Sequence, residues 1–135
     1  MKLLTNDIRE RLLRNGRTRQ VRENDLRGED FPPVVKLFTP DAGCTWLLTE
    51  LDPQEPDIAF GLCDLGMGYP ELGYVSLAEL ASVRGKLGLP IERDLHFTAT
   101  HPLSVYAHAA RVAEAITEDE QALAKAAAAL AGGVS

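Results

Sequence analysis

The amino-acid sequence predicts an α+β fold: an antiparallel sheet of about four or five strands, one face covered by an N-terminal and a C-terminal helix, with a short central helix. Short apolar runs between residues 34 and 65 are typical of β-strands. Turns rich in proline and glycine separate these runs, and connections of about four to six residues favour antiparallel neighbours. Near both ends of the chain, apolar residues recur at the three- and four-residue spacing of amphipathic helices.

The first predicted helix begins at Thr5, which suits a helix N-cap, and ends at Asn15-Gly16. Its apolar stripe consists of Ile8, Leu12 and Leu13. The segment 14–32 has little apolar surface, so burial does not offset the entropy that would be lost on ordering it. We therefore expect a mobile basic loop at 14–32.

The strands predicted from the apolar runs span residues 34–39, 44–51, 58–65 and 91–97. A turn is expected at 69–73, because Pro70 presets φ for its first central position. A short extended segment then leads to a Ser-x-x-Glu capping box, in which the Ser76 hydroxyl accepts from the Glu79 amide and the Glu79 carboxylate accepts from the Ser76 amide. This motif predicts the short central helix, with Gly85 as its C-cap glycine.

The C-terminal helix is expected to open at His101-Pro102. Its apolar stripe consists of Leu103, Tyr106, Ala110, Ala113 and Ile116. A second capping box, Thr117-x-x-Glu120, restarts or kinks the helix. The alanine-rich tail 117–135 then has a narrow apolar face that either docks on the body or pairs with a second copy as a homodimer. We expect a single α+β domain at 1–116, followed by this helical tail.

The net charge of −6 is unevenly distributed. Residues 1–27 hold eight Lys and Arg against four acidic residues, whereas the remainder holds six basic and sixteen acidic residues. An acidic body repels a phosphate backbone, so we expect no nucleic-acid binding except locally through the basic loop. The residues of that loop that could contact phosphate, or instead an acidic partner, are Arg17, Arg19 and Arg22.

The expected location is the cytoplasm. No apolar run approaches the length of about 20 residues that a membrane span needs, and frequent charges in residues 1–13 argue against a signal peptide. Cys44 and Cys63 lack CxxC spacing, so we expect two buried thiols in a reducing compartment, although the sequence neither requires nor excludes a disulfide between them.

Several segments together resemble a known family: "MKLLT", "VVKLFTPDAGCTW", "FGLCDLGMGYPELGYVSLAEL", "RGKLGLPIERDLHF" and "HPLSV". They are similar to a small bacterial family of domains of unknown function that is carried on plasmids and integrative conjugative elements. The resemblance covers roughly residues 1–13 and 33–103, whereas 14–32 and 117–135 depart from it. It implies a cytoplasmic accessory of a mobile element, and it carries over no catalytic residue.

No motif predicts catalysis, a metal or a cofactor. The three histidines, His96, His101 and His108, lack the compact spacing of zinc ligands. The chain has no G-x-S-x-G elbow, and its glycines at 61, 66, 68 and 73 do not form a phosphate-binding loop. We therefore expect no cofactor and no enzymatic activity, and a small hydrolase or metal enzyme is only the third hypothesis.

The first hypothesis is a non-enzymatic protein-binding accessory module of a mobile element, with a host or element-encoded protein as partner. Its preferred contact patch is Tyr69, Glu71 and Tyr74, which surround the predicted rigid turn. The alternative is an acidic anti-defence inhibitor, of the anti-CRISPR or anti-restriction kind, whose carboxylates imitate DNA phosphates. The carboxylates assigned to that role are Glu50, Asp52, Glu55 and Asp57.

Overall fold

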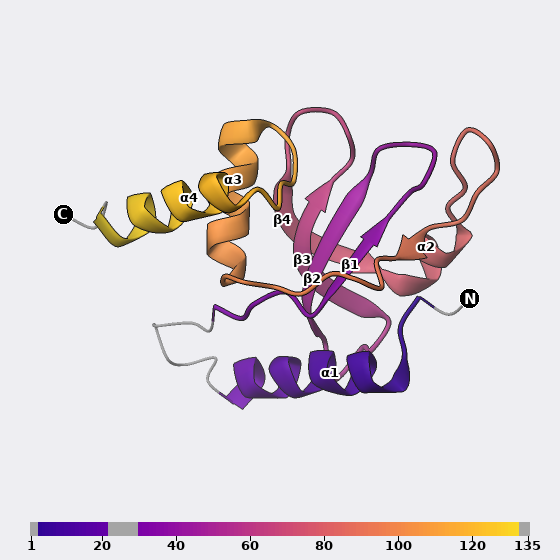
Figure 1. The fold of residues 1–135 in the computed structure, drawn as a ribbon. Helices are drawn as coiled ribbons and strands as arrows, with labels where there is room; N and C mark the ends of the chain where they lie inside the picture. The colour runs from indigo at the N-terminus through magenta and orange to yellow at the C-terminus, as the bar shows by residue number, and fades with distance from the viewer. Residues whose placement is uncertain (1–2, 22–29, 133–135) are drawn as a thin grey trace.

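The computed structural model describes residues 3–21 and 30–132 (Figure 1). These residues form four helices and five strands in the order α1 (Asn6–Val21), β1 (Val35–Phe38), β2 (Thr45–Leu51), β3 (Ile58–Asp64), β4 (Glu71–Ser76), α2 (Leu77–Ser82), β5 (Glu92–Arg93), α3 (Leu103–Ala113) and α4 (Glu120–Gly132). Strands β1 to β4 make an antiparallel meander, and β5 returns to pair with β1. The sheet order is β4-β3-β2-β1-β5, which confirms the predicted α+β class.

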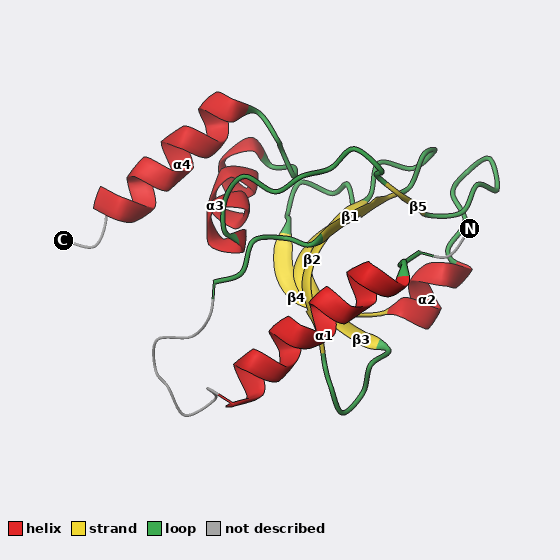
Figure 2. Cartoon of the chain, turned by 60° about the horizontal axis from the view of Figure 1, so that its bottom comes forward, coloured by secondary structure: helices red, strands yellow, loops and turns green. Residues whose placement is uncertain are grey.

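Helices cover both faces of the sheet, so the prediction that the N-terminal and C-terminal helices share one face is wrong. Trp46 and Leu48 belong to a core that includes Leu12 of α1, whereas Leu47 and Leu62 belong to a second core formed with α3 and α4. Successive residues of β2 point to opposite faces, and both sets are apolar, so each face needs its own covering layer. Figure 2 shows α1 and α3 on either side of the strands.

Helix α1 runs past its predicted end at Asn15-Gly16 and continues to Val21. Residues 14–21 are therefore helical rather than part of a loop, and Arg22 lies outside the described residues. Gly16 is a packing residue here, because a Cβ at this position would lie 1.9 Å from the carbonyl oxygen of Leu51. The Asn15 side chain donates to the carbonyl of Thr49 at 2.8 Å, which further ties α1 to β2.

The turn predicted at 69–73 is also wrong, because β4 already begins at Glu71. The chain reverses before this point, where Gly66 and Gly68 adopt positive φ angles of 78° and 86°. Glycine reaches this region without steric cost, and the carboxylate of Asp64 accepts from the Gly66 amide at 2.9 Å. The chain reversal therefore precedes Pro70, and Tyr69 lies two residues before the edge strand β4.

The capping interaction at α2 is confirmed in part. The Ser76 hydroxyl accepts from the Glu79 amide at 3.2 Å, but Asp57 supplies the second contact by accepting from the Ala78 amide at 2.9 Å. No described hydrogen bond joins the Glu79 carboxylate to the Ser76 amide. The C-cap of α2 is Val83 rather than Gly85.

The C-terminal part differs from its prediction in two places. Only Glu92–Arg93 of the expected strand 91–97 pairs with β1. Helix α3 ends before Glu114, which is left-handed at φ 61°, and α4 then starts as a separate helix. Asp119 rather than Thr117 caps α4, because its carboxylate accepts from the amide of Ala122 at 2.9 Å.

Candidate functional site

Strand β4 forms an edge of the sheet, and within the described residues it pairs only with β3. Large apolar side chains are exposed along this strand and the turn before it, with Tyr69 81% exposed and Tyr74 73% exposed. We call this set the β4 surface: Leu65, Met67, Tyr69, Leu72 and Tyr74. An edge strand with unpaired backbone groups and exposed apolar side chains is a template for pairing with another chain.

A row of side chains crosses the sheet beside this edge. Glu50 of β2 lies opposite Phe60 of β3, and Phe60 lies opposite Tyr74 of β4. The row exists because the β2–β3 register shifts between Leu48 and Glu50. Without this β-bulge, Glu50 would share the face of Leu48, since side chains two apart on a regular strand point the same way.

The row forms one wall of a groove of about 290 Å³ that Gly16 and Arg19 of α1 also line. We call it the Glu50 groove, and its lining residues are Gly16, Arg19, Glu50, Asp52, Pro53, Ile58, Phe60 and Tyr74. The rings of Phe60 and Tyr74 pack at a tilt of 58° with their centroids 5.0 Å apart. This contact orients the exposed Tyr74 ring at the outer side of the groove.

Glu50 is the buried charge of this groove, with only 8% of its surface exposed. The Arg19 Nε donates to its two carboxylate oxygens at 2.7 and 2.9 Å. Burial raises the pKa of Glu50 above its ordinary value of 4.5, the contacts with Arg19 oppose that rise, and the neighbouring charge of Asp52 adds to it. Arg19 also places its guanidinium carbon 5.5 Å from the centre of the Phe31 ring.

Asp52 is the second carboxylate of the groove. It is half-buried, and its Oδ1 accepts from the amide of Gln54 at 2.9 Å. In the part of the chain that the structure describes, no Lys or Arg forms an ion pair with Asp52. The described lining of the groove thus carries two carboxylates and one guanidinium.

The remaining predicted residues are separated from this groove or have another role. Asp57 accepts from the Ser76 hydroxyl at 2.6 Å as well as from α2, so its carboxylate is engaged in the fold. Glu55 is exposed in the β2–β3 turn, Arg17 is exposed on α1, and Glu71 is exposed at the start of β4. The structure therefore brings together Arg19, Glu50, Asp52 and Tyr74 among the predicted binding residues.

Sequence reasoning missed Phe60, Leu72 and Met67. Phe60 was placed on a strand, but only the register shows that it lies between Glu50 and Tyr74. Leu72 falls within the turn that the sequence predicts at 69–73, whereas in the structure it lies on the exposed edge strand β4. The position of Met67 in a turn could have been predicted from the glycines on either side of it, because a glycine on each side of one residue favours a chain reversal there.

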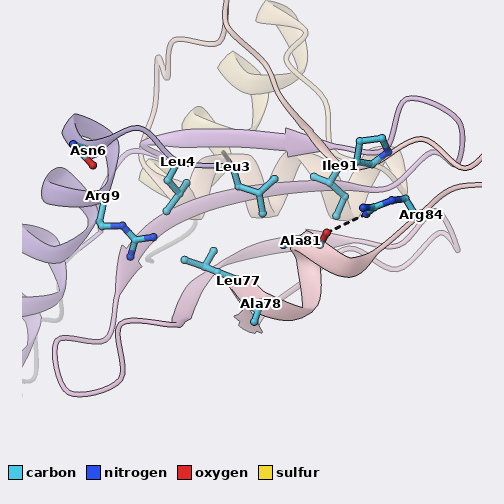
Figure 3. A pocket seen from close by; sticks show the side chains of 10 residues that line it. Leu3, Leu4, Asn6, Arg9, Leu77, Ala78, Ala81, Arg84 and Ile91 are labelled. Carbon is cyan, nitrogen blue, oxygen red and sulfur yellow. Dashed lines mark hydrogen bonds between the residues drawn. The ribbon is translucent and has the colours of Figure 1, made fainter. Parts of the chain in front are cut away.

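A second groove, of about 520 Å³, lies between the N-terminal segment and α2 (Figure 3). Leu3, Leu4, Leu77 and Ile91 point into it. At one end, the Arg84 Nη1 donates to the carbonyls of residues 81 and 83 at 3.0 and 2.8 Å, so this guanidinium secures the end of α2. Within residues 3–21 and 30–132, no three His, Cys, Asp or Glu side chains are placed to hold a metal ion.

Comparison with family models identifies the domain. A model described as a protein of unknown function, DUF2958, matches residues 3–117. The chain belongs to the DUF2958 family. Comparisons with curated proteins and with solved structures found no match.

The β4 surface and the Glu50 groove both lie inside the DUF2958 match, whereas α4 lies beyond it. The match also spans 14–32, which we expected to depart from the family pattern. Among residues 3–21 and 30–132, the helices lack the length and the hydrophobicity of a membrane span.

Proposed function

We propose that this DUF2958 domain is a non-enzymatic protein-binding module that serves a bacterial mobile element and recognises its partner through the β4 surface. The observation that carries the proposal is the exposed apolar side chains along β4, which among the described residues pairs with β3 alone. The mobile-element setting is supported by the resemblance of the quoted sequence segments, and the partner would be encoded by the host or by the element.

Strand addition is the binding mode that this surface favours. An extended segment that pairs with an edge strand gains main-chain hydrogen bonds, and neighbouring side chains supply specificity. Natural edge strands are usually protected by charges or proline; Pro70 and Glu71 stand at the start of β4, but the following stretch Leu72-Gly73-Tyr74-Val75 contains neither. Tyrosines are also enriched among the residues that dominate binding energy, and Tyr69 and Tyr74 are exposed on either side of Leu72.

The acidic-inhibitor alternative has less support. It needs several carboxylates on one accessible surface, as phosphates are along DNA. Glu50 is buried against Arg19, and Asp57 is bound to α2 and Ser76. Asp52 and Glu55 are the members of the set that remain available for such a role. Neutralising both without loss of an inhibition phenotype would eliminate this alternative.

The proposal is tested by affinity capture from host cells with two matched variants. Leu72→Arg places a charge in the middle of the β4 surface, and Val112→Arg places the same charge on the exposed side of α3. Both side chains are exposed, so the free energy of unfolding of both variants should stay within about 0.5 kcal/mol of the wild-type value.

We expect one dominant partner with the wild type and with Val112→Arg, and at least about tenfold less of it with Leu72→Arg, since a charge buried in an interface weakens binding strongly. Equal recovery with both variants would show that the β4 surface is not the contact. Recovery of no partner with the wild type at any salt concentration would reject the binding-module proposal itself.

A further inference from the structure

We propose that the Glu50 groove binds the side chain of a lysine or arginine carried by the segment that pairs with β4. The inference rests on the proposed function for the origin of that segment. It adds a specificity site: the partner would be recognised by one long cationic side chain next to its strand-forming backbone.

The charges of the groove favour a cation. Arg19 is paired with Glu50, so its charge is already matched by one of the two carboxylates. Asp52 adds a second carboxylate that forms no ion pair with any Lys or Arg of the described segments. An entering anion would meet both carboxylates, whereas an entering guanidinium or ammonium group would pair with Asp52 and approach Glu50.

The aromatic and apolar lining suits the rest of such a side chain. The Tyr74 ring is exposed and is supported from behind by Phe60 at 5.0 Å. A cation over an aromatic face is attracted by the negative face of the ring, and the attraction grows as the cation is desolvated. Pro53 and Ile58 provide apolar surface against which the aliphatic stem can lie.

The register explains why the cation would come from an added strand. Glu50, Phe60 and Tyr74 occupy one row across β2, β3 and β4. The partner residue opposite Tyr74 would take the next place in this row, and directly opposite residues have Cβ atoms only about 4.5–5.5 Å apart. Since strands lie about 4.8 Å apart, this residue would start roughly 14 Å from the backbone of β2. Among cationic side chains, Lys and Arg reach furthest from the backbone, so they are the ones that can extend over the Tyr74 ring towards the carboxylates.

The groove can be tested without knowing the partner. The probe is N-acetyl-arginine methylamide, titrated into the uniformly ¹⁵N-labelled full chain and followed by the amide signals of residues 50–60 and 71–76. The comparison compound is N-acetyl-citrulline methylamide, which has nearly the same shape but no charge. We expect saturable shifts with the arginine compound and at least about tenfold weaker binding with citrulline, because a charged hydrogen bond is lost.

Two variants locate the effect. Asp52→Asn keeps the side-chain oxygen that accepts from Gln54 but removes the charge, so it should weaken the arginine compound by about tenfold. Glu55→Gln removes an exposed charge from the same turn and should leave binding unchanged. Equal binding of both compounds, equal loss in both variants, or no saturable shift would each overturn the inference.

Failure of this experiment is distinguishable from failure of the proposed function. In one outcome, the wild type captures the partner and Leu72→Arg loses it while the arginine compound does not bind. This result would support the β4 surface as the contact and reject the cation site. If the arginine compound binds selectively but no partner is captured, the result would support the cation site and reject its assignment to a partner strand.

Discussion

Arg19→Ala is the most informative single substitution, because it leaves Glu50 buried without the guanidinium that compensates its charge. The wild-type contact consists of two charged hydrogen bonds at 2.7 and 2.9 Å, with the Arg19 side chain 38% exposed and the Glu50 side chain 10% exposed. Charged hydrogen bonds contribute about 1.5–3 kcal/mol and exposed ion pairs about 0.2–1 kcal/mol. Since the pair is partly open to solvent, we expect a loss of about 1–2 kcal/mol at pH 7.5, or a fall in Tm of about 3–10 °C at this chain length.

The loss should depend on pH with a definite sign. Burial raises the pKa of Glu50, so the folded protein holds this proton more tightly than the unfolded chain does. Its contribution to stability is therefore fully present below the ordinary pKa of 4.5 and is lost as the pH rises through the folded pKa. Because Arg19 opposes the rise, removing it raises the pKa further and enlarges the loss at neutral pH. Near pH 4 Glu50 is protonated and carries no charge for Arg19 to compensate. The loss in free energy of unfolding caused by Arg19→Ala should therefore fall below about 0.5 kcal/mol.

The assay is urea unfolding followed by circular dichroism at pH 4.0 and pH 7.5. The control is Arg17→Ala, an exposed position on the same helix that should change stability by less than about 0.5 kcal/mol. In a Glu50→Gln background, removing Arg19 should cost much less than in the wild type at pH 7.5. An equal loss at both pH values would refute the reasoning, since it would mean that Arg19 does not act through the charge of Glu50.

Two further predictions concern the sheet. Gly61→Ala should lower the free energy of unfolding by about 3 kcal/mol or more, since its Cβ would lie 2.0 Å from the Leu47 carbonyl oxygen. Gly73→Ala on the edge strand should cost less than about 1 kcal/mol, because its Cβ would meet nothing within 4 Å. Chemical denaturation checks both, and similar losses would contradict the packing geometry. Burial raises the pKa of Cys63 to about 11, against an ordinary 9.0, so at pH 8 its alkylation by iodoacetamide in a Cys44→Ser variant should be roughly a hundredfold slower when folded than when unfolded. Equal rates in the two states would show that Cys63 is accessible as a thiolate.

Part of the candidate site could be predicted from the sequence. Tyr69 and Tyr74 stood out because large aromatic residues lie within a stretch rich in glycine and proline, and the structure leaves both exposed. The turn predicted at 69–73 does not form there, because the chain reverses before Tyr69 and β4 begins at Glu71. Pro70 suits a turn, but it is equally acceptable immediately before an edge strand, so this residue alone does not separate the two conformations.

The grouping of Glu50 with Arg19 and Phe60 could not be predicted from the sequence. A regular alternation along β2 would give Glu50 the same face as Leu48, and the β-bulge that reverses this is a property of the pairing with β3. The helical state of Arg19 was missed for a related reason. Gly16 signals a helix end when only local conformation counts, but in the folded protein it allows α1 to approach Leu51 closely.

The sequence by itself determined the elements that depend on local periodicity and short connections: the antiparallel meander, the cap of α2 by Ser76 and the helices on each side of it in the chain. These features follow from spacing along one segment, because each apolar run or capping pair sets the backbone of its own neighbourhood. The tertiary structure alone decided that both faces of the sheet are covered and that Glu50, Phe60 and Tyr74 form a row across β2, β3 and β4, the last strand in the sheet order. The physical reason is that register and layer order are set by contacts between distant segments, whose relative positions no local pattern specifies.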